Sequence, residues 1–154
     1  EISSCDWSSD VCSSDLKQRD SREQRIIDTI RRCGLRATPQ RIELLKLLRD
    51  TKSHPTAEAL MQMANHEGFN LSMGTVYNTL DSFEKKGLIS RVHGSNDVMH
   101  YDAETDFHVH LVDQSTEEIV DLFDDELEEL IRRRLKAKFP NGFNPQRLEV
   151  TIYQ

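Results

Sequence analysis

The sequence is poor in cysteine, proline, tryptophan and long apolar runs. Of its 154 residues, three are cysteine, four are proline and one is tryptophan. No apolar run approaches the roughly 20 residues that a membrane-spanning helix needs. The N-terminus also lacks the basic flank and apolar stretch of a secretory signal peptide. We therefore expect a cytoplasmic protein with no membrane partner.

The first sixteen residues differ in composition from the rest of the chain. Ser, Asp and Cys recur in residues 1–16 without the period of a helix or a strand. Residues 5–16 resemble the translation of one frame of a common sequencing adapter, and the alternative is a natural disordered tail. We exclude residues 1–16 from fold reasoning and expect them to be disordered. Cys33 then remains alone, so neither an intramolecular disulfide nor a four-thiolate zinc site is expected.

Charge is divided unevenly along the chain, although the net charge is −7. Residues 17–94 hold 14 Lys and Arg against nine Asp and Glu, whereas residues 95–154 hold six against 14. A basic part suits the binding of phosphates, and an acidic part suits collecting cations or keeping the protein soluble. The division suggests two units with different tasks.

The apolar pattern of residues 17–101 predicts short helices followed by a β-hairpin. It predicts a helix over 21–33, a second that starts at residue 39, a third from about 55 to 68, and a fourth between 72 and 87, with Thr38 and Ser72 as N-caps. Strand-like runs at 88–92 and 98–101 are joined by a turn rich in Gly, Ser and Asn. This order of elements is that of a winged helix, a DNA-binding fold.

Residues 102–154 predict a smaller α+β unit. Strands are expected at 109–112, 118–122 and 148–152, with an amphipathic helix over 124–139. We therefore expect an α+β protein with a DNA-binding winged helix at 17–101 and a small α+β domain at 102–154. The edge of its sheet and its helix are suited to pairing with a second copy of the chain.

Residues 72–87 carry the candidate DNA-reading side chains. Val76, Leu80 and Phe83 recur at spacings that build one buried stripe, which leaves other side chains exposed. The predicted reading residues are Ser72, Thr75, Tyr77 and Asn78, and the predicted phosphate contacts are Arg36, Arg41, Lys85, Lys86 and Arg91. A surface Tyr or Lys alone is more often simply solvated, so the combination with a hairpin carries this prediction.

His108 and His110 form the candidate metal-binding pair. In a strand they lie on the same face, so both imidazoles can reach one ion. An isolated His-x-His is more often structural, but Asp102 lies six residues earlier and Asp121 lies in the strand expected to pair with them. Ligation by imidazole and carboxylate without thiolate favours Mn²⁺, Fe²⁺ or Zn²⁺ over copper(I). Periodicity does not show whether His54 joins them.

These segments together resemble the ferric uptake regulator family. The similar segments are 36–41 (RATPQR), 54–58 (HPTAE), 74–80 (GTVYNTL), 87–89 (GLI), His108 with His110, and 118–121 (EIVD), and the resemblance covers about 22–153. It implies a winged helix that binds an inverted-repeat operator in double-stranded DNA as a homodimer. It also implies a C-terminal dimerisation domain and a regulatory ion at the hinge between the domains.

The resemblance further implies a ligand set and a signal. The ligands would be His54, Asp102, His108, His110 and Asp121. Asp rather than Glu at 121 resembles the peroxide-sensing branch, in which hydrogen peroxide reacts at bound Fe²⁺ and oxidises a ligand histidine, here His54 or His108. Many members hold structural zinc with two CxxC pairs. Asp113 and Thr116 stand at the expected first pair and the chain ends before a second, so no four-cysteine zinc is expected.

Four hypotheses follow from these patterns. The leading one is a metal-dependent transcriptional repressor that senses peroxide, or iron or manganese. The second is a zinc- or iron-uptake regulator without peroxide chemistry, and the third is a regulator that has lost metal sensing. The fourth, from another class, is a small His/carboxylate metalloenzyme. We do not expect an enzyme, because no Ser/His/Asp or Cys/His set and no phosphate-cradling Gly-rich loop stand out.

Overall fold

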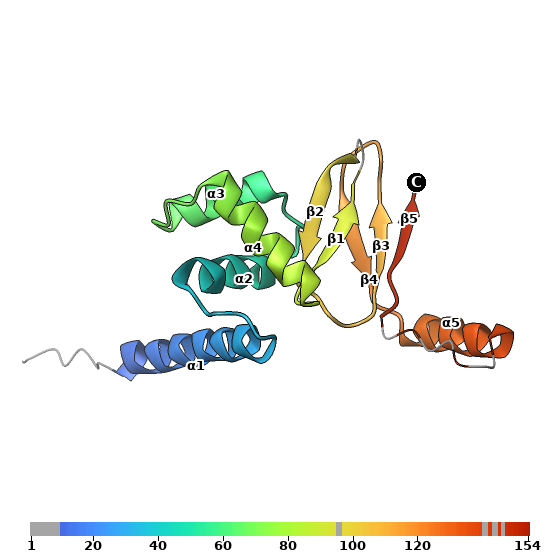
Figure 1. The fold of residues 1–154 in the computed structure, drawn as a ribbon, viewed down its shortest axis with the longest axis horizontal. Coiled ribbons are helices and arrows are strands. Elements are labelled where there is room, and N and C mark those ends of the chain that lie inside the picture. The colour runs from blue at the N-terminus through green and yellow to red at the C-terminus, as the bar shows by residue number, and fades with distance from the viewer. Residues whose placement is uncertain (1–9, 95–96, 140–141, 143–144, 146) are drawn as a thin grey trace, which may run out of the picture.

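The computed structural model describes residues 10–94, 97–139, 142, 145 and 147–154, with side chains from Ser21 onward. Four helices, α1 (Asp10–Arg32), α2 (Pro39–Asp50), α3 (Ala57–His66) and α4 (Met73–Lys85), precede a hairpin of β1 (Ser90–His93) and β2 (Met99–Asp102). The chain continues through β3 (Val109–Val112), β4 (Ile119–Leu122), α5 (Asp125–Lys138) and β5 (Val150–Tyr153). Figure 1 shows α1–α4 on one side of the strands and α5 on the other. The predicted α+β class is confirmed.

Hydroxyl side chains cap the N-termini of three of the helices. Thr38 accepts a hydrogen bond from the backbone N–H of Arg41, with Pro39 in the first turn of α2. Thr56 accepts from the N–H of Ala59, and Ser72 accepts from that of Thr75. These bonds satisfy donors that a helix leaves unpaired at its N-terminus, which is why hydroxyl residues at these positions were informative in the sequence.

The first helix is longer than the sequence pattern predicts. α1 begins at Asp10 rather than at residue 21, so residues 10–16, which we expected to be disordered, are helical. Residues 1–9 of that segment lie outside the described residues. No Gly or Pro interrupts residues 10–20, so nothing in the chain stops the helix from extending N-terminally. Apolar periodicity detects only the part that packs, which here contains the buried Ile26 and Ile30.

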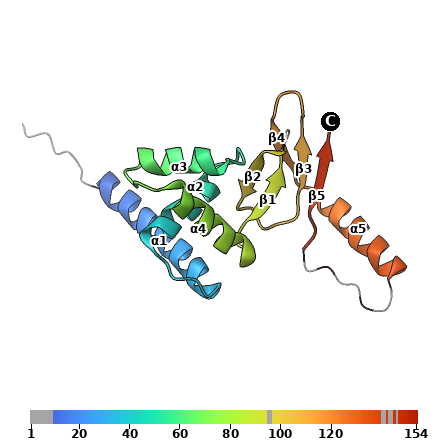
Figure 2. The same ribbon diagram turned by 45° about the horizontal axis from the view of Figure 1, so that its top comes forward.

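The apolar core lies mainly among the helices. Its largest fully buried members include Phe83, Leu80, Leu44 and Leu60, and Tyr101 of β2 joins the same cluster. Figure 2, turned from the first view, shows α1–α4 together on one side of the hairpin. The core therefore anchors both α4 and the hairpin to one rigid unit.

Two small sheets follow the helices. β1 and β2 are antiparallel, with Ser90 opposite Asp102. The second sheet has the order β4-β3-β5, in which β3 is antiparallel to β4 and parallel to β5. His110 stands opposite Asp121 across β3 and β4, which confirms the predicted pairing. The connection between the sheets, residues 103–108, is called the hinge below.

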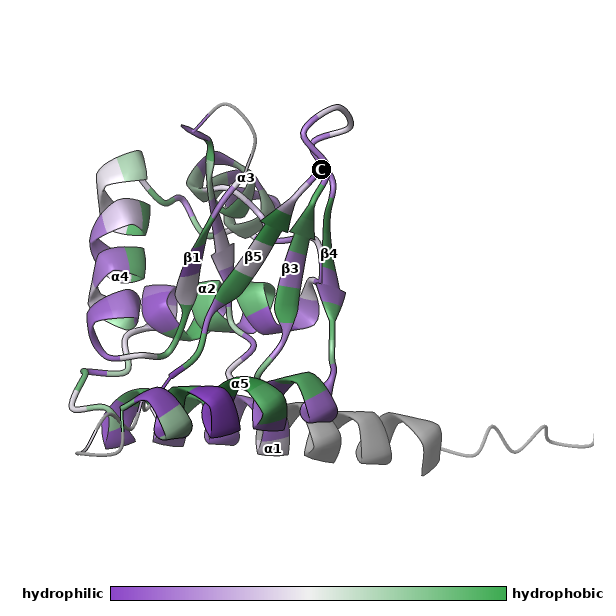
Figure 3. Cartoon of the chain, turned by 90° about the vertical axis from the view of Figure 1, so that its right-hand side faces the viewer, coloured by the Kyte–Doolittle hydropathy of each residue, from purple (hydrophilic) through white to green (hydrophobic). Residues whose placement is uncertain are grey.

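α5 carries an apolar stripe but contributes no buried residue. In Figure 3 the sheet β4-β3-β5 faces the viewer, and α5 lies along its lower end rather than over it. The exposed large apolar side chains on and directly beside these elements are Val120, Leu122, Phe123, Leu130, Phe139, Ile152 and Tyr153. Within the described residues, no helix has both the length and the apolarity needed to span a bilayer.

Asp113 closes the turn between β3 and β4 with its carboxylate. One of its oxygens accepts from the Ser115 N–H at 2.8 Å, the Ser115 hydroxyl at 2.7 Å and the Thr116 N–H at 3.2 Å. The Gln154 amide reaches its other oxygen at 3.4 Å, which ties the chain end to this turn. The bonds from Ser115 and Thr116 lower the pKa of Asp113 to about 2. The Asp113 carboxylate thus holds the turn at the position where many members of the similar family carry their first CxxC pair.

We expect Asp113→Ala to lower the thermal unfolding midpoint, because four donors lose their acceptor. The folded pKa of about 2 lies below the ordinary 3.8. The contribution of ionised Asp113 is therefore present above about pH 4 and is lost as the pH falls towards 2. Circular dichroism melts from pH 7 to 2 measure the gap in unfolding midpoint between the wild type and each variant. This gap should shrink on acidification for Asp113→Ala and for the isosteric Asp113→Asn. A gap that does not change with pH would contradict the assignment.

Candidate metal centre

The five predicted metal ligands converge at the junction of the two sheets. His54 lies just before α3, Asp102 ends β2, His108 ends the hinge, His110 lies in β3 and Asp121 lies in β4. One donor atom from each of His54, His108, His110 and Asp121 lies within 4.8 Å of the others. The fifth residue, Asp102, places Oδ2 3.0 Å from His108 Nε2 and 3.4 Å from His110 Nε2. Five side chains from positions as far apart as 54 and 121 thus lie around one point.

The distances inside the cluster are short. His54 Nε2 lies 3.1 Å from Asp121 Oδ1, and His108 Nε2 lies 2.9 Å from His110 Nε2. Asp121 Oδ1 is 3.8 and 3.7 Å from those two nitrogens. The three histidines and Asp102 are all buried. Asp121 keeps 18% of its side chain exposed, so the cluster meets solvent on that side.

Several of these atoms have no hydrogen-bond partner. Among the described residues, His54 Nε2, Asp102 Oδ2 and Asp121 Oδ1 are buried and unpartnered, as is His54 Nδ1. Burying such groups without a partner is costly, and each carboxylate also carries a negative charge. A cation at their common centre would satisfy the three atoms that face it. The residues present therefore fit a divalent metal ion.

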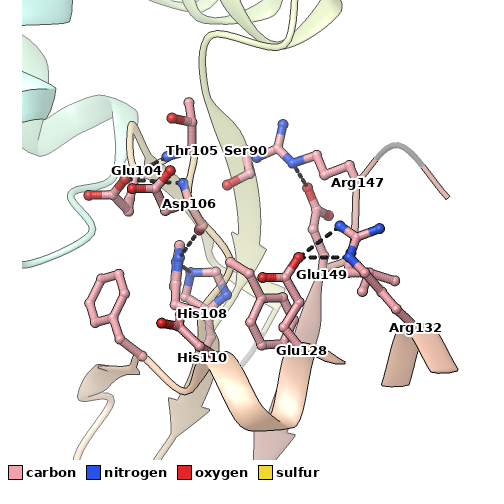
Figure 4. Close-up of a pocket in the computed structure, with 14 residues that line it drawn as sticks. Ser90, Glu104, Thr105, Asp106, His108, His110, Glu128, Arg132, Arg147 and Glu149 are labelled. Carbon is pink, nitrogen blue, oxygen red and sulfur yellow. Dashed lines mark hydrogen bonds and ion pairs between the residues drawn. The ribbon is translucent and has the colours of Figure 1, made fainter. Parts of the chain in front are cut away.

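The tautomer of His108 suits metal binding. Its Nδ1 lies 2.8 Å from the backbone oxygen of Asp106. Because a carbonyl oxygen only accepts, Nδ1 carries the proton, and the Nε2 of the neutral ring presents a lone pair to the cluster. Figure 4 shows this contact beside the paired rings of His108 and His110. Opposite them, in a cleft of about 450 Å³, lie the ion pairs Arg132–Glu128 and Arg147–Glu149.

Two pKa shifts also favour the ligand forms. Burial lowers the pKa of His54, and this effect outweighs the attraction of Asp121 and Asp102. Burial alone would raise the pKa of Asp102, but the His110 ring and the Glu104 N–H outweigh it and lower that pKa. A neutral imidazole and an ionised carboxylate are the forms that bind a metal. Three nitrogens and two carboxylates make a borderline donor set, suited to Mn²⁺, Fe²⁺ or Zn²⁺.

The predicted DNA-reading residues lie on one element, α4. Thr75, Tyr77 and Asn78 are exposed, Ser72 caps the helix, and Val76 is buried on the opposite stripe. The Tyr77 hydroxyl donates to Glu58 Oε1 of α3 at 3.0 Å. This bond lowers the pKa of Glu58, after the larger effect of that residue's own backbone N–H, and it raises the pKa of Tyr77.

The predicted phosphate contacts differ in their partners. Lys85 pairs with Asp81 at 2.6 Å, and Arg91 pairs with Glu84 at 2.7 Å and with Asp81. The other three, Arg36, Lys86 and Arg41, are exposed or half-buried, and Arg41 donates to the Arg36 carbonyl. The basic surface around α4 is therefore partly neutralised by its own acids.

Two contributors were missed by the sequence reasoning. The backbone carbonyl of Asp106 orients His108, and every residue type carries such a carbonyl, so no sequence signal exists. Glu58 holds Tyr77 from a different helix, 19 positions away. Only the packing of α3 against α4 brings these two side chains together.

The chain is similar to known regulators along most of its length. The model of the ferric uptake regulator family matches residues 32–153. The peroxide-responsive repressor PerR of Staphylococcus saprophyticus is 30% identical over 141 residues, which cover 92% of this chain and 93% of that protein. Among solved structures, the Campylobacter jejuni peroxide stress regulator is 26% identical, with a TM-score of 0.66, over 85% of this chain and 93% of that one. The Pseudomonas aeruginosa ferric uptake regulator with manganese is 25% identical, with a TM-score of 0.73, over 82% and 94%.

We expect His110→Ala to weaken Mn²⁺ binding by more than about 100-fold, because loss of a ligand costs more than loss of an outer-shell partner. Isothermal titration of the metal-free protein with Mn²⁺ measures this effect. His66→Ala is the matched control, since His66 is an exposed histidine at the end of α3. Equal Mn²⁺ affinity for His110→Ala and His66→Ala would contradict the site.

Proposed function

The chain belongs to the ferric uptake regulator family, and we propose that it is a metal-dependent, DNA-binding transcriptional repressor. The observation that carries this proposal is the cluster of unpartnered donors contributed by both halves of the chain. His54 comes from the helical domain, whereas His108, His110 and Asp121 come from the hinge and the second sheet. One cation shared by these groups stabilises a single relative position of the two domains.

Metal would act by selecting that position. A ligand shifts an equilibrium only by its differential affinity for the two states, and a near-complete switch needs a preference of about 10⁴-fold. Loss of His54 from the coordination sphere would free the helical domain from the hinge. The residues proposed to reach DNA, above all Tyr77, Thr75 and Asn78 of α4, belong to the domain that would then be released.

We propose peroxide as the first candidate signal. Asp121 supports this choice, and so does the similarity to peroxide-responsive repressors. Fe²⁺, when bound, would supply the one-electron chemistry that activates hydrogen peroxide beside His54 and His108, and the histidine ring would supply the two electrons of the net reaction. In the net reaction, one peroxide oxygen is inserted at a ring C–H of one histidine, and the other oxygen leaves as water. A cleft of about 470 Å³, lined by Arg49, Lys52, His54 and Asp121 among others, gives small molecules access.

We propose that the repressor is a homodimer joined through the second domain. Leu127, Leu130, Ile131 and Leu135 form the apolar stripe of α5, and none of them is buried in the single chain. Val120 on β4 and Ile152 on β5 are about half exposed, at 49% and 51%. Exposed apolar side chains gathered on one domain mark an association surface. Two copies would also present two α4 helices to an inverted-repeat operator in double-stranded DNA, in the bacterial cytoplasm.

The other hypotheses predict different behaviour. An uptake regulator would release DNA on chelation of Fe²⁺ or Zn²⁺ and would ignore peroxide. A regulator without metal sensing would bind DNA with no added ion. An enzyme would consume substrate through many turnovers, whereas the proposed oxidation ends after one event at each site.

DNA binding should depend on Mn²⁺ and on Tyr77 independently. A duplex selected from a random pool with the Mn²⁺-loaded wild-type protein serves as the probe in fluorescence anisotropy. We expect Tyr77→Ala to weaken this binding about tenfold, because an anchoring aromatic contact is lost, while leaving Mn²⁺ affinity unchanged. Asp102→Ala should abolish the response to Mn²⁺, with the circular dichroism spectrum retained. Metal-independent DNA binding by the wild type would overturn the proposal.

Peroxide should mark the Fe²⁺-loaded protein permanently. We expect exposure to hydrogen peroxide to add the mass of one oxygen atom to His54 or His108, located by peptide mass spectrometry, with release of the selected duplex. The Mn²⁺-loaded protein is the control and should stay unmodified and bound, because Mn²⁺ does not reduce peroxide in this way. Release by chelator alone, with no added oxygen, would favour the uptake regulator instead.

A further inference from the structure

We infer that His100 is a positioning residue for the metal centre, and that glycine is required at 94 because it leaves room for the His100 ring. The inference rests on the proposed function and adds to it a physical link between the hairpin turn and the ligand His54. His100 lies in β2 and is not among the predicted ligands. Its ring contacts the backbone of His54 and does not reach a coordinating atom.

His54 has an unusual backbone conformation. Its φ of +47° lies in the left-handed region, which side-chain-bearing residues adopt rarely and histidine somewhat more readily than most. Such a conformation persists when surrounding contacts hold it. Both the orientation of the His54 ring and its distance from Asp121 follow from this backbone. The contacts that hold residue 54 therefore control the availability of one ligand.

β2 supplies those contacts. The His100 Nδ1 is hydrogen bonded to the carbonyl oxygen of His54, and Nδ1 must donate because the carbonyl only accepts. The Tyr101 N–H donates to the Pro55 carbonyl at 3.1 Å, and Thr56 forms an isolated bridge with His100. Two of these three contacts come from the backbone and survive substitution. The bond from the His100 ring is the side-chain contribution.

The hairpin turn controls the position of that ring. A Cβ at residue 94 would lie 2.7 Å from both Cδ2 and Nε2 of His100, and 3.3 Å from the Val98 carbonyl oxygen. The Gly94 N–H donates to that same carbonyl at 2.9 Å, so the backbone here is already engaged. A methyl group at 94 would therefore displace the His100 ring and its bond to His54. The turn, the ring and the ligand form one continuous contact path.

The matched pair His100→Leu and His100→Asn tests the donor. Leu and Asn have the same branched shape, but only Asn can place an N–H where Nδ1 lies. Measured by Mn²⁺ titration of the full chain, His100→Leu should weaken binding about five-fold, the effect of one net hydrogen bond. His100→Asn should remain within about two-fold of wild type, because the donor is kept. His93→Leu, an exposed histidine on the neighbouring strand, is the control and should bind Mn²⁺ normally.

Gly94→Ala tests the contact path separately. It should weaken Mn²⁺ binding about as much as His100→Leu, because it breaks the same bond by displacing the ring. In a His100→Ala background, where no ring remains to displace, Gly94→Ala should have no further effect on Mn²⁺ affinity. This double-mutant cycle isolates the coupling between the two positions.

The outcomes separate the inference from the proposed function. Wild-type Mn²⁺ affinity for His100→Leu, or equal losses for His100→Leu and His100→Asn, would overturn the role of His100. Additive losses in the cycle would overturn the role of Gly94. If His54→Ala itself binds Mn²⁺ as tightly as wild type, the proposed site fails instead. A change in the melting temperature of the metal-free protein without a change in Mn²⁺ affinity would show that His100 only stabilises the fold, and would also overturn the inference.

Discussion

The need for a positive charge among buried acceptors is the constraint on which the rest of this structure depends. Among the described residues, three buried atoms of the centre, His54 Nε2, Asp102 Oδ2 and Asp121 Oδ1, have no hydrogen-bond partner. Such a group of atoms is unfavourable in a protein interior unless a cation is shared among them. Because His54 lies just before α3 and the other ligand candidates lie in β2, the hinge and the second sheet, a cation bound there would also set how these parts of the chain meet. Metal occupancy and their relative position would then form one equilibrium.

Contacts around the centre position the side chains that are proposed to bind the metal. The Asp106 carbonyl selects the tautomer of His108, and β2 holds the strained backbone of His54. Asp113 closes the turn after β3 with hydrogen bonds, which keeps β3 and β4 in the register that sets His110 opposite Asp121. The five ligand candidates, three histidines and two aspartates, include no thiolate.

The side of the protein that is proposed to face DNA combines an apolar stripe with exposed ion pairs. α4 is held by an apolar stripe, while its exposed face carries Tyr77 bonded to Glu58 and Lys85 bonded to Asp81. Acids thus restrain the side chains proposed to reach DNA. Exposed ion pairs are weak, so phosphates can replace these acids at little cost. The side chains of such a surface are ordered in the free protein, but they can still exchange their acidic partners for phosphates.

The sequence by itself determined the local features of this protein. The N-caps Thr38 and Ser72, the α4 stripe, and the shared face of His108 and His110 all follow from spacing and residue type. The pairing of β3 with β4 was also within reach, because a short turn joins them. These features depend on residues that are neighbours in the chain.

Only the tertiary structure decided the rest. Whether His54 joins the centre depends on a left-handed backbone and on contacts with His100, 46 positions away, which no periodicity encodes. The early start of α1 and the absence of buried residues in α5 were likewise invisible to pattern, because amphipathicity shows that a face is apolar but not what covers it. Packing between segments that are distant in the chain assembles a set of metal ligands. Spacing in the sequence can therefore suggest candidate ligands, but it does not show that they lie close together.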